Sequence, residues 1–518
     1  MRYLQRNIIL PTLGIDKEIP PEYIGERSTP NCKNIQIENN IIKKRLGMTV
    51  LGTAPMANGP VLAVTELYSG GVRYVVRIGI RKAERLIGNT WTDITPATQL
   101  SGTSSDMFST TIPILAGARI LVFTNYIDAI KKWVPIGNFA DLGGVPSGLR
   151  AKYVLAYGVY LILAHINTGS LTVGNRVQWS DTGAIETWTG GNSGSVDLVE
   201  DGNNITGMNI FGSYIAVHKE TSIYLGYMVN TSDIFIFDRK YTGVGTISNN
   251  SIQNLNTGDQ IFLANDGIRI FNGLSTNLIP SGINNEIAKT INYKYLSNCW
   301  SVVVPEINEY WLGIPTYGDI PSEVYKFNYK TGQAYKDNRR IISAVGKYLK
   351  TTDITIGEMT GMIKDWDSKR FSDVYPESLN SIIIFGDRDG NTFEREKESS
   401  PEYKDMYQDG GSTAIDAEWE TKDYEGKDPG RLCRWIEMQI WAYGSSVSIK
   451  YSKDSGMNWS SPISITLAGD YPTDDSPKFA YFDVVSSKIR FKISNATAGE
   501  TFALKKMTVK FAECEMRH

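Results

Sequence analysis

The chain has 518 residues and a formal net charge of −3, with 41% hydrophobic and 21% charged residues. This is the balance of a globular protein, and a slightly acidic chain does not favour tight binding of duplex DNA, which needs a basic face. The 4 cysteines are widely spaced without a CxxC pair, which argues against a zinc cluster and against a disulfide framework. No run of about 18 apolar residues occurs, so we expect no membrane-spanning segment.

Residues 1–55 differ from the rest of the chain. Residues 7–30 hold several prolines and little periodicity, which indicates an extended arm. The stretch NIQIENNIIKKRLGMTVL then predicts a hairpin with Asn39 and Asn40 at its turn. We expect a strand this early to pair with the last repeat unit and to fasten a ring of sheets.

The hairpin carries a basic run, Lys43, Lys44 and Arg45. Such a run is ordinary at a solvated strand end. The alternative is a contact with a neighbouring subunit or with passing DNA. These residues are therefore possible interface or DNA-facing positions.

Residues 56–400 repeat short apolar strands separated by Gly, Asn, Asp and Pro turns, in units of about 35–45 residues, the period of a four-stranded blade. The units are 60–95, 107–142, 151–188, 205–241, 248–283, 299–337 and 341–398, of which the last is the least regular. This predicts an all-β protein with a β-propeller of six or seven blades, because closing sheets into a ring removes their edges. Stacked β-sandwiches are the structural alternative. A short helix is expected within 284–296.

Residues 401–518 read as a separate domain. A charged, turn-rich stretch at 399–411 is the best candidate for a linker. After it come about seven alternating strands, which are typical of a β-sandwich. The predicted organisation is thus an arm with a fastening hairpin, a propeller and a C-terminal β-sandwich.

No motif of a catalytic triad, a zinc protease or a phosphate-binding loop is present. His165 and His218 lie in alternating strands, where a histidine is more often structural than catalytic. The acidic turn GDRDGN is shorter than an EF-hand loop and lacks its distal glutamate, so a plain turn is favoured over a calcium site. We therefore expect a protein that is not an enzyme and needs no catalytic residue, cofactor or metal.

Two turns resemble the Asp-box hairpin turn of sialidases and related propellers. The first matches S-x-D-x-G-x-x-W with Ser452, Asp454, Gly456 and Trp459, and a looser copy has Ser180, Asp181 and Trp188. Physically, the Asp accepts hydrogen bonds from turn amides, the Gly adopts a positive φ and the Trp packs beneath. We interpret both as structural turns. The alternative function is a carbohydrate-binding or sialidase-like glycoside hydrolase propeller, whose paired carboxylates the sequence does not place.

An ordered set of motifs resembles the tail hub or tail nozzle proteins of short-tailed bacteriophages. The set begins with NCKNIQIENNIIKKRLGMTVLG, in which Leu46 stands where the family usually has Pro. A W-S-D segment, a K-E-x-S-I-Y strand, a G-x-x-S-x-x-S loop and a D-G-I-x-x-F-x-G hairpin follow in that order. Each motif is weak alone, and their order carries the resemblance.

The resemblance implies a structural virion protein of the tail, assembled in the cytoplasm of the bacterial host. Members of the family form ring homo-oligomers, commonly homohexamers, below the portal and adaptor. They extend the DNA channel, help to retain packaged DNA until ejection, and support fibres or spikes. The implied partners are copies of the chain itself, the portal or adaptor, tail fibre or spike proteins, and DNA that passes without specific binding.

Overall fold

The computed structural model of the chain describes residues 3–229, 234–339, 341–349, 381–396, 401–407, 410–467, 469 and 476–514. In these residues the regular structure is almost entirely β-strand, with the helix α1 (Ile283–Thr290) and two short 3-10 helices, η1 (Asn249–Ser251) and η2 (Tyr293–Asn298). The predicted all-β class is confirmed, and the helix expected within 284–296 falls on α1 and η2. None of these helices is long and apolar enough to cross a membrane.

Residue contacts divide the chain into two compact units. Unit 1 contains Met1–Thr49, Gln253–Arg340 and Glu396–His518, and unit 2 contains Val50–Ile252 and Ile341–Arg395. This division cuts across the predicted segments 1–55, 56–400 and 401–518, because strands from both ends of the chain share sheets in unit 1.

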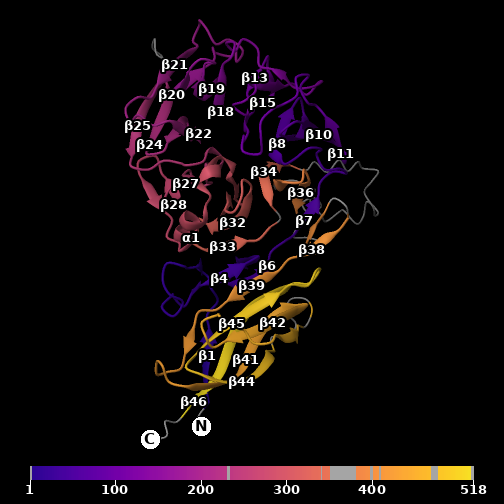
Figure 1. Cartoon of the computed structure of the whole chain (residues 1–518), viewed down its shortest axis with the longest axis vertical. Coiled ribbons are helices and arrows are strands. Elements are labelled where there is room, and N and C mark those ends of the chain that lie inside the picture. Colours follow the sequence, from indigo (N-terminus) through magenta and orange to yellow (C-terminus); the bar gives the residue numbers. More distant parts are fainter. Residues whose placement is uncertain are drawn as a thin grey trace, which may run out of the picture. The chain divides into compact units, whose positions relative to one another are not determined.

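Unit 2 consists of consecutive antiparallel sheets, each made from one of the repeat units (Figure 1). Sheet I has β8 (Val61–Ser69), β9 (Val72–Gly79), β10 (Ala83–Ile87) and β11 (Thr90–Asp93). Sheet II has β12 (Ser109–Thr111), β15 (Leu121–Thr124), β16 (Lys131–Trp133) and β17 (Ala140–Asp141), with the hairpin β13 (Ile114–Leu115) and β14 (Ala118–Arg119) between its first two strands.

The later repeats of unit 2 follow the same plan. Sheet III has β18 (Arg150–Tyr157), β19 (Tyr160–Asn167), β20 (Thr172–Trp179) and β21 (Gly194–Asp197). Sheet IV has β22 (Ile205–Phe211), β23 (Tyr214–Lys219), β24 (Ser222–Met228) and β25 (Phe235–Thr242). Sheet VII includes β34 (Ile342–Tyr348), β35 (Ile382–Asp387) and β36 (Thr392–Arg395). Residues 350–380 of the seventh predicted repeat lie outside the described residues.

Apolar cores join neighbouring sheets of unit 2. Val61 of sheet I packs with Ala344 and Ile384 of sheet VII, and Leu67 of sheet I packs with Trp133 of sheet II. The next two cores join sheet II to sheet III through Val122 and Leu163, and sheet III to sheet IV through Val177 and Ile215. Sheets I, II and III thus each contribute to two cores shared with different neighbours, as the alternation of apolar residues along the strands requires.

The segment that enters unit 2 is hydrogen-bonded to sheet VII. The amide of Leu51 donates to the carbonyl of Thr392 at 2.9 Å, and the amide of Met56 donates to Gly390 at 2.8 Å. Leu51 and Met56, which precede the first repeat, are therefore hydrogen-bonded to the last repeat. The predicted hairpin itself, β5 (Ile35–Glu38) and β6 (Ile41–Lys44), forms as expected, but its strands belong to unit 1.

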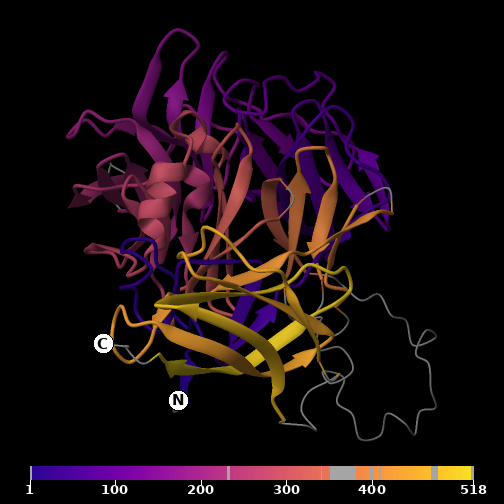
Figure 2. The ribbon, with the colours of Figure 1, turned by 60° about the horizontal axis from the view of Figure 1, so that its bottom comes forward.

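Unit 1 contains sheets V and VI and two sheets built from both chain ends, called here the terminal sheets (Figure 2). Sheet V has β26 (Gln253–Asn254), β27 (Gln260–Ala264), β28 (Gly267–Phe271) and β29 (Thr276–Leu278). Sheet VI has β30 (Trp300–Val304), β31 (Glu309–Pro315), β32 (Pro321–Asn328) and β33 (Ala334–Asp337).

The first terminal sheet continues from sheet VI, because β33 pairs in parallel with β4 (Asn31–Lys33). From β4 the order runs through β39 (Ala417–Glu420), β45 (Lys488–Asn495), β42 (Ser446–Ser452) and β43 (Ile463–Thr466). The short strands β2 (Gly14–Ile15), β3 (Ser28–Thr29) and β40 (Tyr424–Glu425) attach to this sheet.

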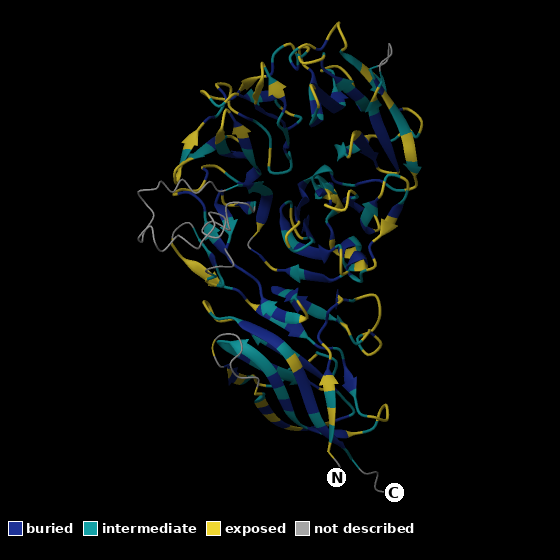
Figure 3. Cartoon of the chain, turned by 180° about the vertical axis from the view of Figure 1, so that it is seen from behind, coloured by how far each residue is buried: buried dark blue, intermediate teal, exposed yellow. Residues whose placement is uncertain are grey.

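The second terminal sheet has the order β44 (Lys478–Ser486), β41 (Cys433–Gly444), β46 (Phe502–Glu513), β6 and β5, and β1 (Leu4–Ile8) also pairs with β46. Burial alternates along its strands, most regularly along β44 (Figure 3). Asn39 and Asn40 have φ of 51° and 61°, as a tight β-hairpin turn requires.

Of the predicted linker 399–411, the described part contains β37 (Lys404–Met406), which pairs with β38 (Ser412–Ala414) and β7 (Met48–Val50).

Candidate functional site

The Asp-box turn after β42 uses its polar groups within the turn. The Ser452 hydroxyl donates to Asp454 Oδ1 at 2.6 Å and accepts from the Gly456 amide at 2.9 Å. Asp454 also accepts from the amide and side chain of Asn458 at 2.9 and 2.6 Å. The Ser452 hydroxyl and the Asn458 N–H groups together lower the pKa of Asp454 to about 2. This carboxylate is thus an ionised turn acceptor, which makes it a poor general acid or base near neutral pH.

Gly456 and Trp459 take the positions that the motif predicts. Gly456 has a φ of 90°, and a Cβ atom there would lie 3.0 Å from Arg490 Nη1 and 3.4 Å from the Trp459 ring. Arg490 in turn donates to the buried carboxylate of Asp423 at 2.7 Å. The turn is therefore closely packed on β45, and glycine is the residue that fits it.

The looser copy in sheet III is also a closed turn. Asp181 Oδ1 accepts from the amides of Thr182 and Asn192, both at 2.8 Å. Ser180 is fully buried, and its hydroxyl accepts from the Leu161 amide at 3.0 Å. Trp188 is buried in the core shared by sheets II and III. The polar atoms of both motifs thus stabilise local structure.

The structure places Lys44 and Arg45 inside the protein, so neither the solvated strand end nor the alternative interface or DNA-facing position is correct for them. Lys44 is 2% exposed, and its ammonium donates to Asn495 Oδ1 at 2.8 Å and to the Thr497 carbonyl at 2.9 Å. Burial lowers the pKa of Lys44 to about 8, against the opposing influence of the Glu500 carboxylate. Lys43 alone is partly exposed, and it pairs with Glu38 at 2.8 Å.

Arg45 is 1% exposed and is held by a carboxylate. Its guanidinium donates to both oxygens of Asp405, at 3.0 and 2.6 Å, and to Asn34 Oδ1 at 2.9 Å. Burial alone would lower the pKa of Arg45, but the Asp405 carboxylate holds this pKa above its ordinary value. A two-pronged guanidinium–carboxylate contact of this kind fixes the geometry of both groups.

Ion pairs with a buried cation recur in the repeat sheets, and sequence reasoning did not find them. Arg77 pairs with Glu84, Lys131 with Asp141, Lys219 with Asp201 and Lys326 with Asp337, and the side chain of each cation is at most 4% exposed. Three of the pairs join adjacent strands of one sheet, and Lys219 of β23 pairs with Asp201 in the segment before β22, the first strand of sheet IV. A local spacing signal exists for Arg77 and Glu84, seven residues apart, and for Lys131 and Asp141, ten apart, since each pair stands opposite on adjacent strands.

The acidic turn GDRDGN is also hydrogen-bonded internally. Asp387 Oδ1 accepts from the amides of Asp389 and Asn391 at 2.9 and 2.7 Å, and Oδ2 accepts from the Asn391 side chain at 2.9 Å. In the part of the chain that the structure describes, no three His, Cys, Asp or Glu side chains are grouped as a metal site would need.

Comparisons with known proteins give no family for the chain. No family model and no curated protein matches it. Solved structures similar to it include the Swd1 (Cps50) β-propeller domain of Myceliophthora thermophila, with 9% identity over 53% of this chain and 86% of that one and a TM-score of 0.32.

Two further similar structures belong to proteins of other kinds. An exo-β-1,3-galactanase of Phanerochaete chrysosporium has 10% identity over 89% of this chain and 100% of that one, with a TM-score of 0.24. A protein of unknown function from Desulfotomaculum acetoxidans has 9% identity over 59% and 94%, with a TM-score of 0.32. Likeness at this level carries no weight for the function of this chain.

Proposed function

We propose that the chain is a structural, non-enzymatic tail protein of a short-tailed bacteriophage, a hub or nozzle subunit. In this proposal the seven repeat sheets are the blades of a β-propeller, and the two terminal sheets form a β-sandwich that includes N-terminal strands. Copies of the chain form a ring, expected to be a homohexamer, which extends the DNA channel below the portal and adaptor and supports fibres or spikes.

The observation that carries the proposal is the role of the polar residues in the ordered motifs. Lys219 and Ser222 of the K-E-x-S-I-Y strand are buried and bind the Asp201 carboxylate. In the G-x-x-S-x-x-S loop, Ser251 donates to the Ser248 carbonyl at 2.7 Å. Residues used in this way stabilise architecture, which supports a structural role for the motifs that carry the resemblance.

The cores and ion pairs of unit 2 support a rigid body, which suits a ring subunit. Sheets VII, I, II, III and IV share a core at each junction. Burying one large aliphatic side chain contributes about 1.5–3 kcal/mol. A framework of this kind leaves the loops free for subunit contacts. The net charge of −3 suits a conduit that DNA passes without adhering.

Mass photometry of the purified chain, followed by negative-stain imaging, tests the ring. We expect a species of about six times the 57.6 kDa chain mass, with a central channel in the class averages. Because such rings can require the growing particle, the measurement is repeated with the adaptor protein of the same phage. A monomer in both samples would contradict the proposal.

The carbohydrate alternative gains no specific support from the Asp-box turns. Asp454 and Asp181 accept hydrogen bonds from turn amides and so do not present free carboxylates. Hydrolysis of any member of a glycan panel by the purified chain would nevertheless favour that alternative over the tail protein.

A further inference from the structure

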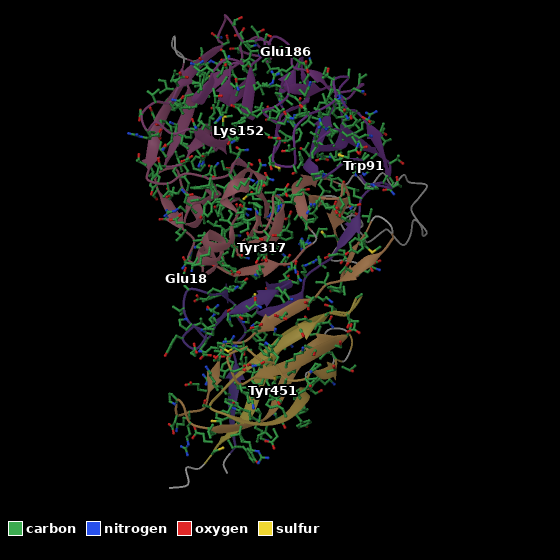
Figure 4. All side chains as sticks on the ribbon, in the orientation of Figure 1. Glu18, Trp91, Lys152, Glu186, Tyr317 and Tyr451 are labelled. Atoms are coloured by element: carbon green, nitrogen blue, oxygen red, sulfur yellow. The ribbon has the colours of Figure 1, made fainter. Side chains whose placement is uncertain are left out.

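One end of sheet III gathers titratable and aromatic side chains that the proposed function does not use. Lys152 lies on β18, and His165 lies opposite it on β19, between the paired residues Ala151–Ile166 and Tyr153–Ala164. Both side chains are half-buried. Figure 4 labels Lys152 among the side chains of this sheet. The Lys152 ammonium is 5.7 Å from the centre of the Tyr153 ring.

The backbone at this place is strained. His165 and Tyr126 have φ of 56° and 65°, in the left-handed region that side chains other than glycine rarely adopt. Their rings meet edge to face at 5.5 Å, and the Tyr153 ring lies 6.4 Å from His165. Strained positions of this kind cluster at functional sites, where the surroundings hold them in place.

The cationic groups here lack a compensating carboxylate. Within the described residues, Lys152 has no hydrogen-bonding or ion-pair partner. Burial lowers its pKa. Burial also lowers the pKa of His165; the hydrogen bond to the Ile205 carbonyl opposes this shift, and the Lys152 ammonium adds to it. Arg150, two residues before Lys152 on the same face of β18, donates to the Ile127 and Leu149 carbonyls.

The acids of the neighbouring elements are already engaged. Asp128 accepts from the hydroxyl and amide of Ser101 at 2.5 and 2.9 Å. Asp201 is bound by the buried Lys219 ammonium. Neither carboxylate exerts an influence on the pKa of Lys152 or His165. A half-buried ammonium beside an imidazole, with no counter-charge from the chain, is arranged to receive an anion from outside.

The ring orientation of His165 leaves one nitrogen for a ligand. Its Nδ1 is 3.2 Å from the Ile205 carbonyl oxygen, so the Nδ1–H donates there. Nε2 has no protein partner in the described part of the chain. When it is protonated, Nε2–H becomes a second donor beside the Lys152 ammonium.

We propose that Lys152 and His165, with Tyr126 and Tyr153 as walls, form a binding site for a phosphate-type oxyanion. The anion accepts hydrogen bonds from Lys152 Nζ and His165 Nε2, and Arg150 adds to the positive field. No bond is made or broken, and the site is independent of the ring assembly proposed above.

The test is calorimetric titration of the full chain with sodium sulfate at constant ionic strength, because sulfate keeps its charge between pH 5.5 and 8. We expect saturable binding of sulfate, with an affinity about tenfold higher at pH 5.5 than at pH 8, since protonated His165 adds a charge-assisted hydrogen bond. Lys152→Met should weaken binding about tenfold or more, and Lys152→Arg should retain it. His165→Asn, which tolerates the positive φ, should remove the pH dependence.

The control is Lys330→Met, which removes an exposed lysine of unit 1 and should bind sulfate like the wild type. Circular dichroism confirms that each variant is folded. The proposal is overturned if the wild type does not bind sulfate saturably, or if Lys152→Met binds sulfate as tightly as the wild type.

A second titration identifies the source of the oxyanion. A thymidine dinucleotide that displaces sulfate shows that the site accepts a nucleic-acid phosphodiester. If the dinucleotide leaves sulfate bound, the site takes a free oxyanion instead. Both results support the site and differ only in its ligand.

Discussion

Replacing Arg45 by Met should destabilise the chain far more than replacing its neighbour Lys43. The Arg45 guanidinium is 1% exposed and binds both oxygens of Asp405. Its loss leaves a largely buried carboxylate without its cation, which costs about 3–5 kcal/mol. Lys43→Met breaks the pair with Glu38, in which both side chains are about 40% exposed, so about 1 kcal/mol or less is expected for that pair.

Urea unfolding followed by tryptophan fluorescence compares the two variants. Because the chain has two compact units, unfolding need not be two-state, and hydrogen exchange of the β6 amides supplies a local measure. Adding Asp405→Leu to Arg45→Met should recover part of the loss, since the unpaired charge is then gone. If Arg45→Met and Lys43→Met differ by less than about 1 kcal/mol, the reasoning from burial is wrong.

Three further predictions concern other polar groups. The folded-state pKa of Lys44, about 8, lies below its unfolded value, so the unfolded chain binds more protons between these values and stability rises with pH there. Between pH 8 and 9.5 the unfolding free energy of the wild type should therefore rise by about 1–2 kcal/mol more than that of Lys44→Met. Urea midpoints of the two proteins that change equally with pH would contradict this. Ser452→Ala should cost about 1–3 kcal/mol in thermal unfolding, because the Gly456 amide loses its acceptor; an unchanged midpoint would refute the turn's role. Asp181→Ala should cost about 1–2 kcal/mol for a similar reason, and faster exchange of the Asn192 amide would verify it.

The repeat sheets were predictable because each is built from local signals. Apolar alternation and turn residues lie within one repeat, and strands pair with others of the same repeat, as in β8 to β11. The turn at Asn39 and Asn40 was predictable for the same reason, since two adjacent residues with positive φ favour Asn.

The pairing of the chain ends was not predictable in this way. β1 pairs with β46 in the register Leu4 to Phe511, a contact that no local pattern encodes. The burial of Arg45 depends on Asp405, which is 360 positions further along the chain. A basic run is usually solvated, so the sequence favoured an exposed position until its distant partners were known.

The proposed anion site is a further feature that could not be predicted from the sequence. The sequence favours a structural role for His165, because this histidine stands alone in a strand pattern. Its position opposite Lys152 follows from the register of β18 and β19, and its positive φ follows from the irregular pairing of β19 with β20. Register and backbone strain are properties of the folded sheet, so only the structure brings these side chains together.

The most direct test of the proposed tail role is cryo-electron microscopy of phage particles from the phage whose genome encodes the chain. We expect the chain in an axial ring below the portal and adaptor, with its copies surrounding the DNA path and contacting fibres or spikes. Density for the chain elsewhere in the particle, or no ring of it around the DNA channel, would contradict its assignment as a tail hub or nozzle protein.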